Sequence, residues 1–101
     1  MGSKAKIPIP HDQIELFCRM HHIKRLALFG SVLTDRFGNE SDIDILVDFE
    51  PGQVVGLIRM AKLERELSDI LGRHVDLRTP ADLSRYFRDE VLASAEVQYA
   101  V

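Results

Sequence analysis

Two groups of residues in one short segment, residues 30–44, have the types and spacing needed to bind a charged ligand. Gly30 and Ser31 end an apolar run, and such a pair can offer backbone N–H groups and a hydroxyl to a phosphate. Asp42 and Asp44 open a second apolar run. Residues two apart on a strand share a face, so these carboxylates repel each other unless a cation lies between them. The segment therefore predicts a site for a metal-bound nucleoside triphosphate.

A third carboxylate is expected from a later strand. Asp76 lies in the middle of the segment 74–78, between two apolar neighbours, and would face away from both of them. If this strand lies beside the second one, Asp76 completes a carboxylate triad. An alternative for Asp76 is an ordinary ion pair with Arg73 or Arg78. For the earlier motif the alternative is a solvated turn ahead of a strand, with Ser41 and Asp42 as turn formers.

The elements that must position these residues follow from the apolar pattern. Strands are expected over residues 24–29, 42–49 and 74–78. Helices are expected over residues 11–22, 54–71 and 86–95. Shorter helical turns are expected from Ser31, as its cap, to Arg36, and from Thr79 onward, while Gly72 should stop the long helix and residues 96–101 have no clear assignment. This order predicts an α/β domain of the α+β type, with a small mixed β-sheet flanked by helices.

Length and composition predict a single modest domain. The chain has 101 residues, 46% of them apolar and 29% charged, as in ordinary globular proteins. No repeat or linker divides it, so residues 7–101 are expected to form the domain and residues 1–6 a flexible leader.

Charge and cysteine content exclude several classes of function. A net charge of -3 argues against broad, sequence-independent binding to nucleic acid. Apolar runs are too short for a membrane span, and the first residues lack the apolar core of a signal peptide. The single cysteine, Cys18, has no internal disulfide partner and is expected to be a buried structural thiol in a cytoplasmic protein.

The motifs together resemble those of the DNA polymerase β nucleotidyltransferase superfamily, and more closely its minimal nucleotidyltransferase (MntA-like) branch. Ten residues separate the Gly-Ser pair from the Asp-Ile-Asp motif, and the third aspartate follows on a later strand. The resemblance runs from about residue 7 to the C-terminus and implies a polymerase β-like core. It implies the following roles: Asp42 and Asp44 as metal ligands, Asp76 as the third catalytic and metal-binding carboxylate, and Gly30, Ser31 and Arg36 as the triphosphate-binding residues.

The resemblance also implies an activity and a partner. Members of this branch commonly act as antitoxins, so we expect Mg²⁺-dependent transfer of AMP from ATP to a tyrosine of a HEPN-family toxin. Neither a membrane nor nucleic acid is expected as a partner, and homo-oligomerisation is left open. Two alternatives remain: an antitoxin that neutralises the toxin by binding alone, and a nucleotidyltransferase acting on a small molecule. The core uses nearly all of the sequence, which favours a protein acceptor.

Overall fold

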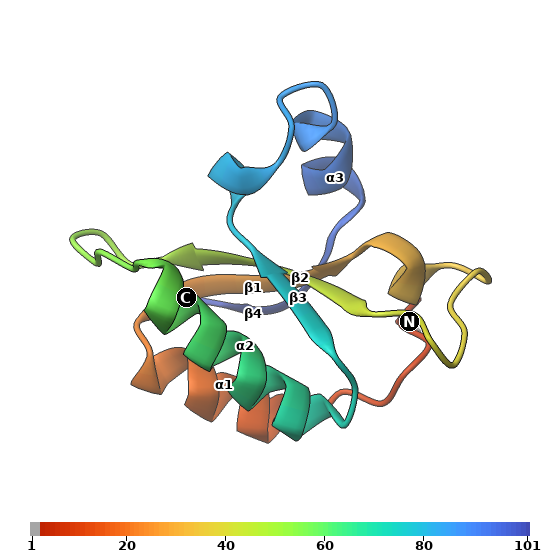
Figure 1. Ribbon diagram of the computed structural model, residues 1–101, viewed down its shortest axis with the longest axis horizontal. Helices are drawn as coiled ribbons and strands as arrows, with labels where there is room; N and C mark the ends of the chain where they lie inside the picture. The colour runs from red at the N-terminus through yellow and green to blue at the C-terminus, as the bar shows by residue number, and fades with distance from the viewer. Residues whose placement is uncertain (1–2) are drawn as a thin grey trace.

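The structure is a computed structural model that describes residues 3–101, and it has a central four-stranded sheet with helices on both sides (Figure 1). In chain order the elements are α1 (His11–Met20), β1 (Ile23–Phe29), the 3₁₀ turn η1 (Gly30–Leu33), β2 (Ile43–Phe49), α2 (Leu57–Leu71), β3 (Val75–Arg78), the 3₁₀ turn η2 (Pro80–Asp82), α3 (Arg88–Ser94) and β4 (Glu96–Ala100). None of the helices within residues 3–101 has the length and apolar content needed to cross a membrane.

The sheet has the strand order β3-β2-β1-β4 and is mixed. β1 pairs with β2 and with β4 in antiparallel orientation, whereas β2 and β3 are parallel. β2 and β3 are parallel because α2, which connects them, returns the chain to the end of the sheet at which β2 began. The α+β class and the small mixed sheet predicted from the sequence are confirmed.

One face of the sheet carries the apolar core. α1 and α2 lie together under this face, while η2 and α3 stand on the opposite side (Figure 1). The buried core consists of Ile14, Phe17, Cys18, Ile23, Leu26, Leu28, Val32, Ile43, Ile45, Val47, Leu63, Leu67, Val75 and Leu77. Cys18 is buried in this core, as expected for a structural thiol, and burial raises the pKa of the thiol to about 12. Alternate residues of β2 and β3, including the aspartates, face away from this core.

Most boundaries differ from those predicted by one to three residues, and one strand was missed. α2 begins at Leu57, three residues late, because the extended Gly56 is its N-cap. The last helix covers only Arg88–Ser94. The tail forms β4, which pairs with β1 at the edge of the sheet. Its side chains are half-buried or exposed, so the segment lacks the strong apolar alternation that marks a strand in a sequence.

The first residues of the chain run beside β4 and η1. A leader was expected over residues 1–6, and residues 1 and 2 of it lie outside the described part of the chain. Ser3 Oγ and the Lys4 backbone N–H both donate hydrogen bonds to the Glu96 carboxylate. The Lys6 backbone N–H donates to the Val32 carbonyl at 2.9 Å. These bonds bring Lys4 to the neighbourhood of η1.

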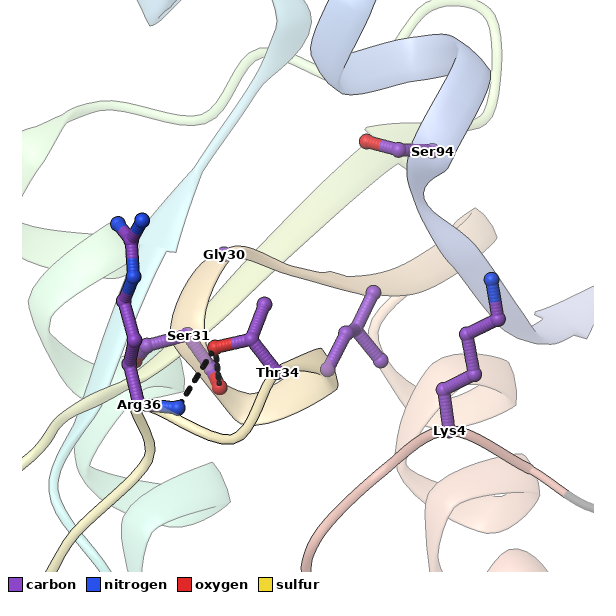
Figure 2. A pocket seen from close by; sticks show the side chains of 7 residues that line it. Lys4, Gly30, Ser31, Thr34, Arg36 and Ser94 are labelled. Atoms are coloured by element: carbon purple, nitrogen blue, oxygen red, sulfur yellow. Dashed lines mark hydrogen bonds between the residues drawn. The ribbon is translucent and has the colours of Figure 1, made fainter.

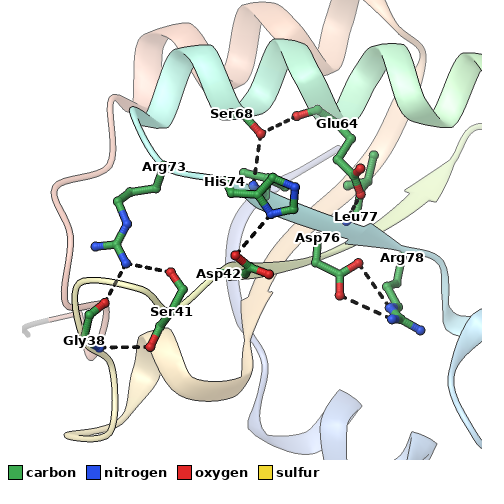
Figure 3. Close-up of polar contacts among 11 residues, drawn as sticks. Gly38, Ser41, Asp42, Glu64, Ser68, Arg73, His74, Asp76, Leu77 and Arg78 are labelled. Atoms are coloured by element: carbon green, nitrogen blue, oxygen red, sulfur yellow. Dashed lines mark hydrogen bonds and ion pairs between the residues drawn. The ribbon is translucent and has the colours of Figure 1, made fainter.

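Side chains of α2 cover the outer edge of β3. Ser68 Oγ accepts a hydrogen bond from the Val75 backbone N–H at 3.0 Å, and Glu64 Oε2 accepts one from the Leu77 N–H at 2.8 Å (Figure 3). An edge strand otherwise presents unpaired backbone groups. The helix thus fixes the position of β3, and with it the position of Asp76.

We predict that Glu64→Ala lowers the free energy of unfolding by about 1–3 kcal/mol, because the half-buried Leu77 N–H is left without an acceptor. Glu64→Gln keeps a side-chain oxygen acceptor and is the matched control, with a smaller loss. Equilibrium urea unfolding measures both changes. Equal losses in the two variants would contradict the role assigned to this bond.

Candidate active site

The parallel pairing of β2 with β3 brings two of the predicted carboxylates side by side. Asp44 and Asp76 are register partners in these strands. Val75 and Leu77 point into the core, so Asp76 lies on the opposite, open face of the sheet. The condition set for Asp76 from the sequence, that the third strand lies beside the second, is met.

The end of β1 lies against Asp44 from the other side. Phe29 is the register partner of Asp44, and Gly30 follows it with a φ of +76°. A Cβ atom on Gly30 would overlap Oδ2 of Asp44, and the positive φ also disfavours any residue with a side chain. Only glycine therefore lets the loop of residues 30–36, called the phosphate loop after the role that the sequence predicts for it, approach the carboxylates so closely.

A cavity of about 450 Å³ opens beside Gly30 (Figure 2). Its lining residues are Lys4, Gly30, Ser31, Leu33, Thr34, Arg36 and Ser94. The side chains of Lys4 and Arg36 rise on opposite sides of this cavity, and the Ser94 hydroxyl of α3 faces it from above. Two cationic side chains and neighbouring hydroxyls provide the donors and the charge that a polyphosphate requires.

Ser31 does not cap the turn as predicted from the sequence. Phe29 is the N-cap of η1, and within the described chain no side chain caps this turn. Thr34 is the C-cap of the turn, and its hydroxyl and its backbone N–H each donate to the Ser31 carbonyl at 2.9 Å. The Thr34 hydroxyl also accepts from the Arg36 N–H at 3.2 Å. The Ser31 side chain is therefore available to line the cavity.

Asp42 and Asp76 each have a basic neighbour. Nδ1 of His74 lies 3.2 Å from Oδ1 of Asp42, and Nη2 of Arg78 lies 3.3 Å from Oδ2 of Asp76 (Figure 3). The second contact is the ion pair that was the alternative explanation for Asp76. Among residues 3–101, no three histidine, cysteine or acidic side chains are grouped closely enough to hold a metal ion as they stand. Binding one would require these two carboxylates to turn toward Asp44.

The electrostatics of Asp44 fit a cation. Burial raises the pKa of this carboxyl above its usual value, and the negative charges of Asp76 and Asp42 raise it further, while Arg78 acts in the opposite direction. A hard divalent cation would remove this repulsion and takes carboxylate oxygens as ligands. The donors present are thus of the type that Mg²⁺ prefers, and Asp44 lies between the phosphate loop and the other acids.

Three residues of the site were not found from the sequence. Lys4 and Ser94 reach the cavity from segments far apart in the chain, and no motif marks either of them. His74 contacts Asp42 and occupies the same strand face as Asp76, because the two residues are two apart. That spacing was the available signal for His74.

We predict that Gly30→Ala destabilises the protein by more than the roughly 1–2 kcal/mol of a left-handed backbone, because its Cβ also overlaps Asp44. Gly52→Ala is the matched control, since Gly52 has a φ of +87° but its Cβ would meet no described atom within 4 Å. Thermal unfolding compares the two. Adding Asp44→Ala to Gly30→Ala should recover part of the loss; equal losses at both glycines would contradict the overlap.

We predict that Asp44→Asn stabilises the protein at neutral pH by up to about 1 kcal/mol, measured by urea unfolding without divalent metal. The folded state raises the pKa of Asp44, so it binds this proton more tightly than the unfolded state does. The contribution of Asp44 to stability therefore falls as pH rises from the ordinary carboxyl pKa through the raised one. The gain from Asp44→Asn should disappear in acid; a gain independent of pH would contradict this cause.

Known proteins of similar sequence indicate one enzyme family. The profile of the nucleotidyltransferase domain family matches residues 12–97. A Methanocaldococcus jannaschii protein with the provisional name protein adenylyltransferase is 36% identical over 75 residues, which cover 74% of this chain and 78% of that protein. Protein adenylyltransferase MntA of Thermococcus cleftensis is 34% identical over 70 residues, which cover 69% of each chain.

Solved structures show the same fold. A protein provisionally described as a minimal nucleotidyltransferase is 33% identical, with a TM-score of 0.69 over 84% of this chain and 85% of that one. A chain of a toxin–antitoxin crystal structure with AMP-PNP has a TM-score of 0.74 at 22% identity, covering 92% of this chain and 75% of its own. A complex of a tri-AMPylated Shewanella oneidensis HEPN toxin with its MNT antitoxin gives 0.65 at 22% identity, covering 90% and 70%. The chain belongs to the nucleotidyltransferase domain family, in the minimal branch that includes protein adenylyltransferase MntA.

Proposed function

We propose that this protein is a Mg²⁺-dependent adenylyltransferase that transfers AMP from ATP to a tyrosine of a HEPN-family toxin and so acts as a cytoplasmic antitoxin. One observation carries the proposal: Asp44 lies between Asp76 on one side and Gly30 of the phosphate loop on the other. The relatives named protein adenylyltransferases support the reaction class. The MNT–HEPN complex of the same fold supports the choice of acceptor.

The phosphate loop and its surroundings would hold the nucleotide. Backbone N–H groups near Gly30 and the Ser31 hydroxyl would bind the β- and γ-phosphates, with Arg36 and Lys4 supplying positive charge from opposite sides of the cavity. Held in this way, the triphosphate would present its α-phosphorus toward the carboxylates, as in-line nucleotidyl transfer requires.

The carboxylates would serve the transfer itself. Asp42 and Asp44 would hold Mg²⁺, which when bound neutralises charge on the triphosphate and on the attacking oxygen. Asp76 would accept the proton of the tyrosine hydroxyl as the phenolic oxygen forms its bond to the α-phosphorus. The bond from the α-phosphorus to the bridging oxygen breaks, and pyrophosphate leaves with that electron pair.

We predict that Asp42→Ala and Asp44→Ala each abolish transfer while the protein stays folded. Purified protein is mixed with Mg²⁺, α-labelled ATP and a lysate of its own cells, and labelled proteins are analysed by gel and mass spectrometry. Loss of a residue that supports a metal ligand lowers metal affinity or activity by about 10–100-fold, so loss of a ligand itself should lower the activity further. Asp48→Ala is the matched control, an acid on the same strand outside the site, and should retain labelling.

The outcome separates the proposal from its alternatives. A small protein labelled on tyrosine, with labelling absent in the two variants, supports the proposal. Labelling retained in both variants contradicts the site. An unlabelled toxin that still binds the chain indicates neutralisation by binding, whereas a labelled small molecule indicates the other class of acceptor.

A further inference from the structure

Arg73 connects the turn before β3 to the loop that precedes Asp42. Its Nη2 atom donates to the carbonyls of Gly38 and Ser41, each at 2.6 Å (Figure 3). Its guanidinium carbon lies 4.4 Å from the centre of the Phe37 ring. Two hydrogen bonds and one cation–π contact therefore join segments more than thirty residues apart in the chain.

The contacted segment, residues 38–41, is a small closed turn. The Gly38 N–H donates to Ser41 Oγ at 3.0 Å, and the Ser41 N–H donates to the Gly38 carbonyl at 3.1 Å. Residues 38–40 are exposed, so burial contributes little to holding this turn in place. Asp42 follows it directly, and Arg36 of the phosphate loop lies just before Phe37. The backbone position of Asp42 thus depends on how firmly the turn is anchored.

Arg73 itself extends from a rigid part of the fold. Before it, Gly72 ends α2 in the left-handed conformation, and its N–H donates to the Ser68 carbonyl at 2.9 Å. After it, the His74 carbonyl accepts the Ile43 N–H at 2.9 Å, which starts the pairing of β3 with β2. A helix end and a strand start therefore fix the Arg73 backbone from both sides.

We propose that Arg73 is a positioning residue for the metal site: it anchors the turn 38–41 and thereby fixes the backbone that carries Asp42 beside Asp44. This inference rests on the proposed function, because it assigns Asp42 to the metal. The guanidinium suits the task, since one planar group donates to two carbonyls while its face lies on an aromatic ring. A lysine keeps the charge but has neither the plane nor the fixed donor geometry, so Arg73→Lys isolates the positioning role.

The test compares Arg73→Lys with Arg85→Lys. Arg85 also lies over an aromatic ring, 5.1 Å from the centre of Tyr86, but it is exposed and belongs to the segment before α3. Amide hydrogen exchange reports on the turn without turnover, and broadening of NMR signals by Mn²⁺ reports on metal affinity. We expect Arg73→Lys to speed exchange within residues 38–42 and to weaken Mn²⁺ binding about tenfold, the usual effect of losing support for a ligand. Arg85→Lys should change neither.

Labelling with ATP at increasing metal concentration adds a readout that general destabilisation does not mimic. Saturating Mn²⁺ should restore the activity of Arg73→Lys but not that of Asp42→Ala. If the wild-type protein binds Mn²⁺ and Arg73→Lys binds it with the same affinity, the role of Arg73 is overturned but the proposed function is not. Faster exchange throughout the variant, with no specific effect on residues 38–42, would do the same. Absence of Mn²⁺ binding by the wild-type protein would overturn the proposed function and this inference with it.

Discussion

Repulsion among three carboxylates on the open face of one small sheet is the constraint on which the rest of the structure depends. Burial and the charges of Asp42 and Asp76 raise the pKa of Asp44, so its ionised form is unfavourable where it stands. The opposite face offsets this cost, because its strands pack against α1 and α2 in a continuous apolar core. Arg78, which lies beside Asp76, reduces the remaining repulsion. A core on one face thus allows the other face to keep an electrostatically unfavourable arrangement.

The helix α2 links the core to the site. Leu63 and Leu67 on one side of it are buried in the core. On the adjacent side, Glu64 and Ser68 accept hydrogen bonds from the outer edge of β3, which holds that short strand in register. The same helix ends at the left-handed Gly72, and the next residue, Arg73, donates hydrogen bonds to the turn before Asp42. Core packing, the register of β3 and the position of the loop before Asp42 therefore all depend on α2.

Charge is separated within the site although the chain is acidic overall. The net charge is -3, yet two basic side chains, Lys4 and Arg36, flank the cavity next to the phosphate loop. Asp44 lies against Gly30 on the other side, with Asp76 as its partner in the sheet, so Gly30 is the point of contact between the two regions. A ligand with phosphates at one end and a bound cation at the other would match both regions at once. The positive φ of Gly30 and the lack of a side chain make this contact sterically feasible.

The sequence by itself determined the class of the fold, the two central strands, the long helix with its stop at Gly72, and the motif residues from Gly30 to Asp44, because apolar periodicity and motif spacing are local properties. Only the tertiary structure decided that Asp44 is the register partner of Asp76 and that Lys4 and Ser94 reach the cavity. It also decided that the tail becomes β4, since this half-exposed segment forms a strand through its pairing with β1. These features depend on contacts between segments far apart in the chain, and no local pattern encodes which distant partner a segment will meet.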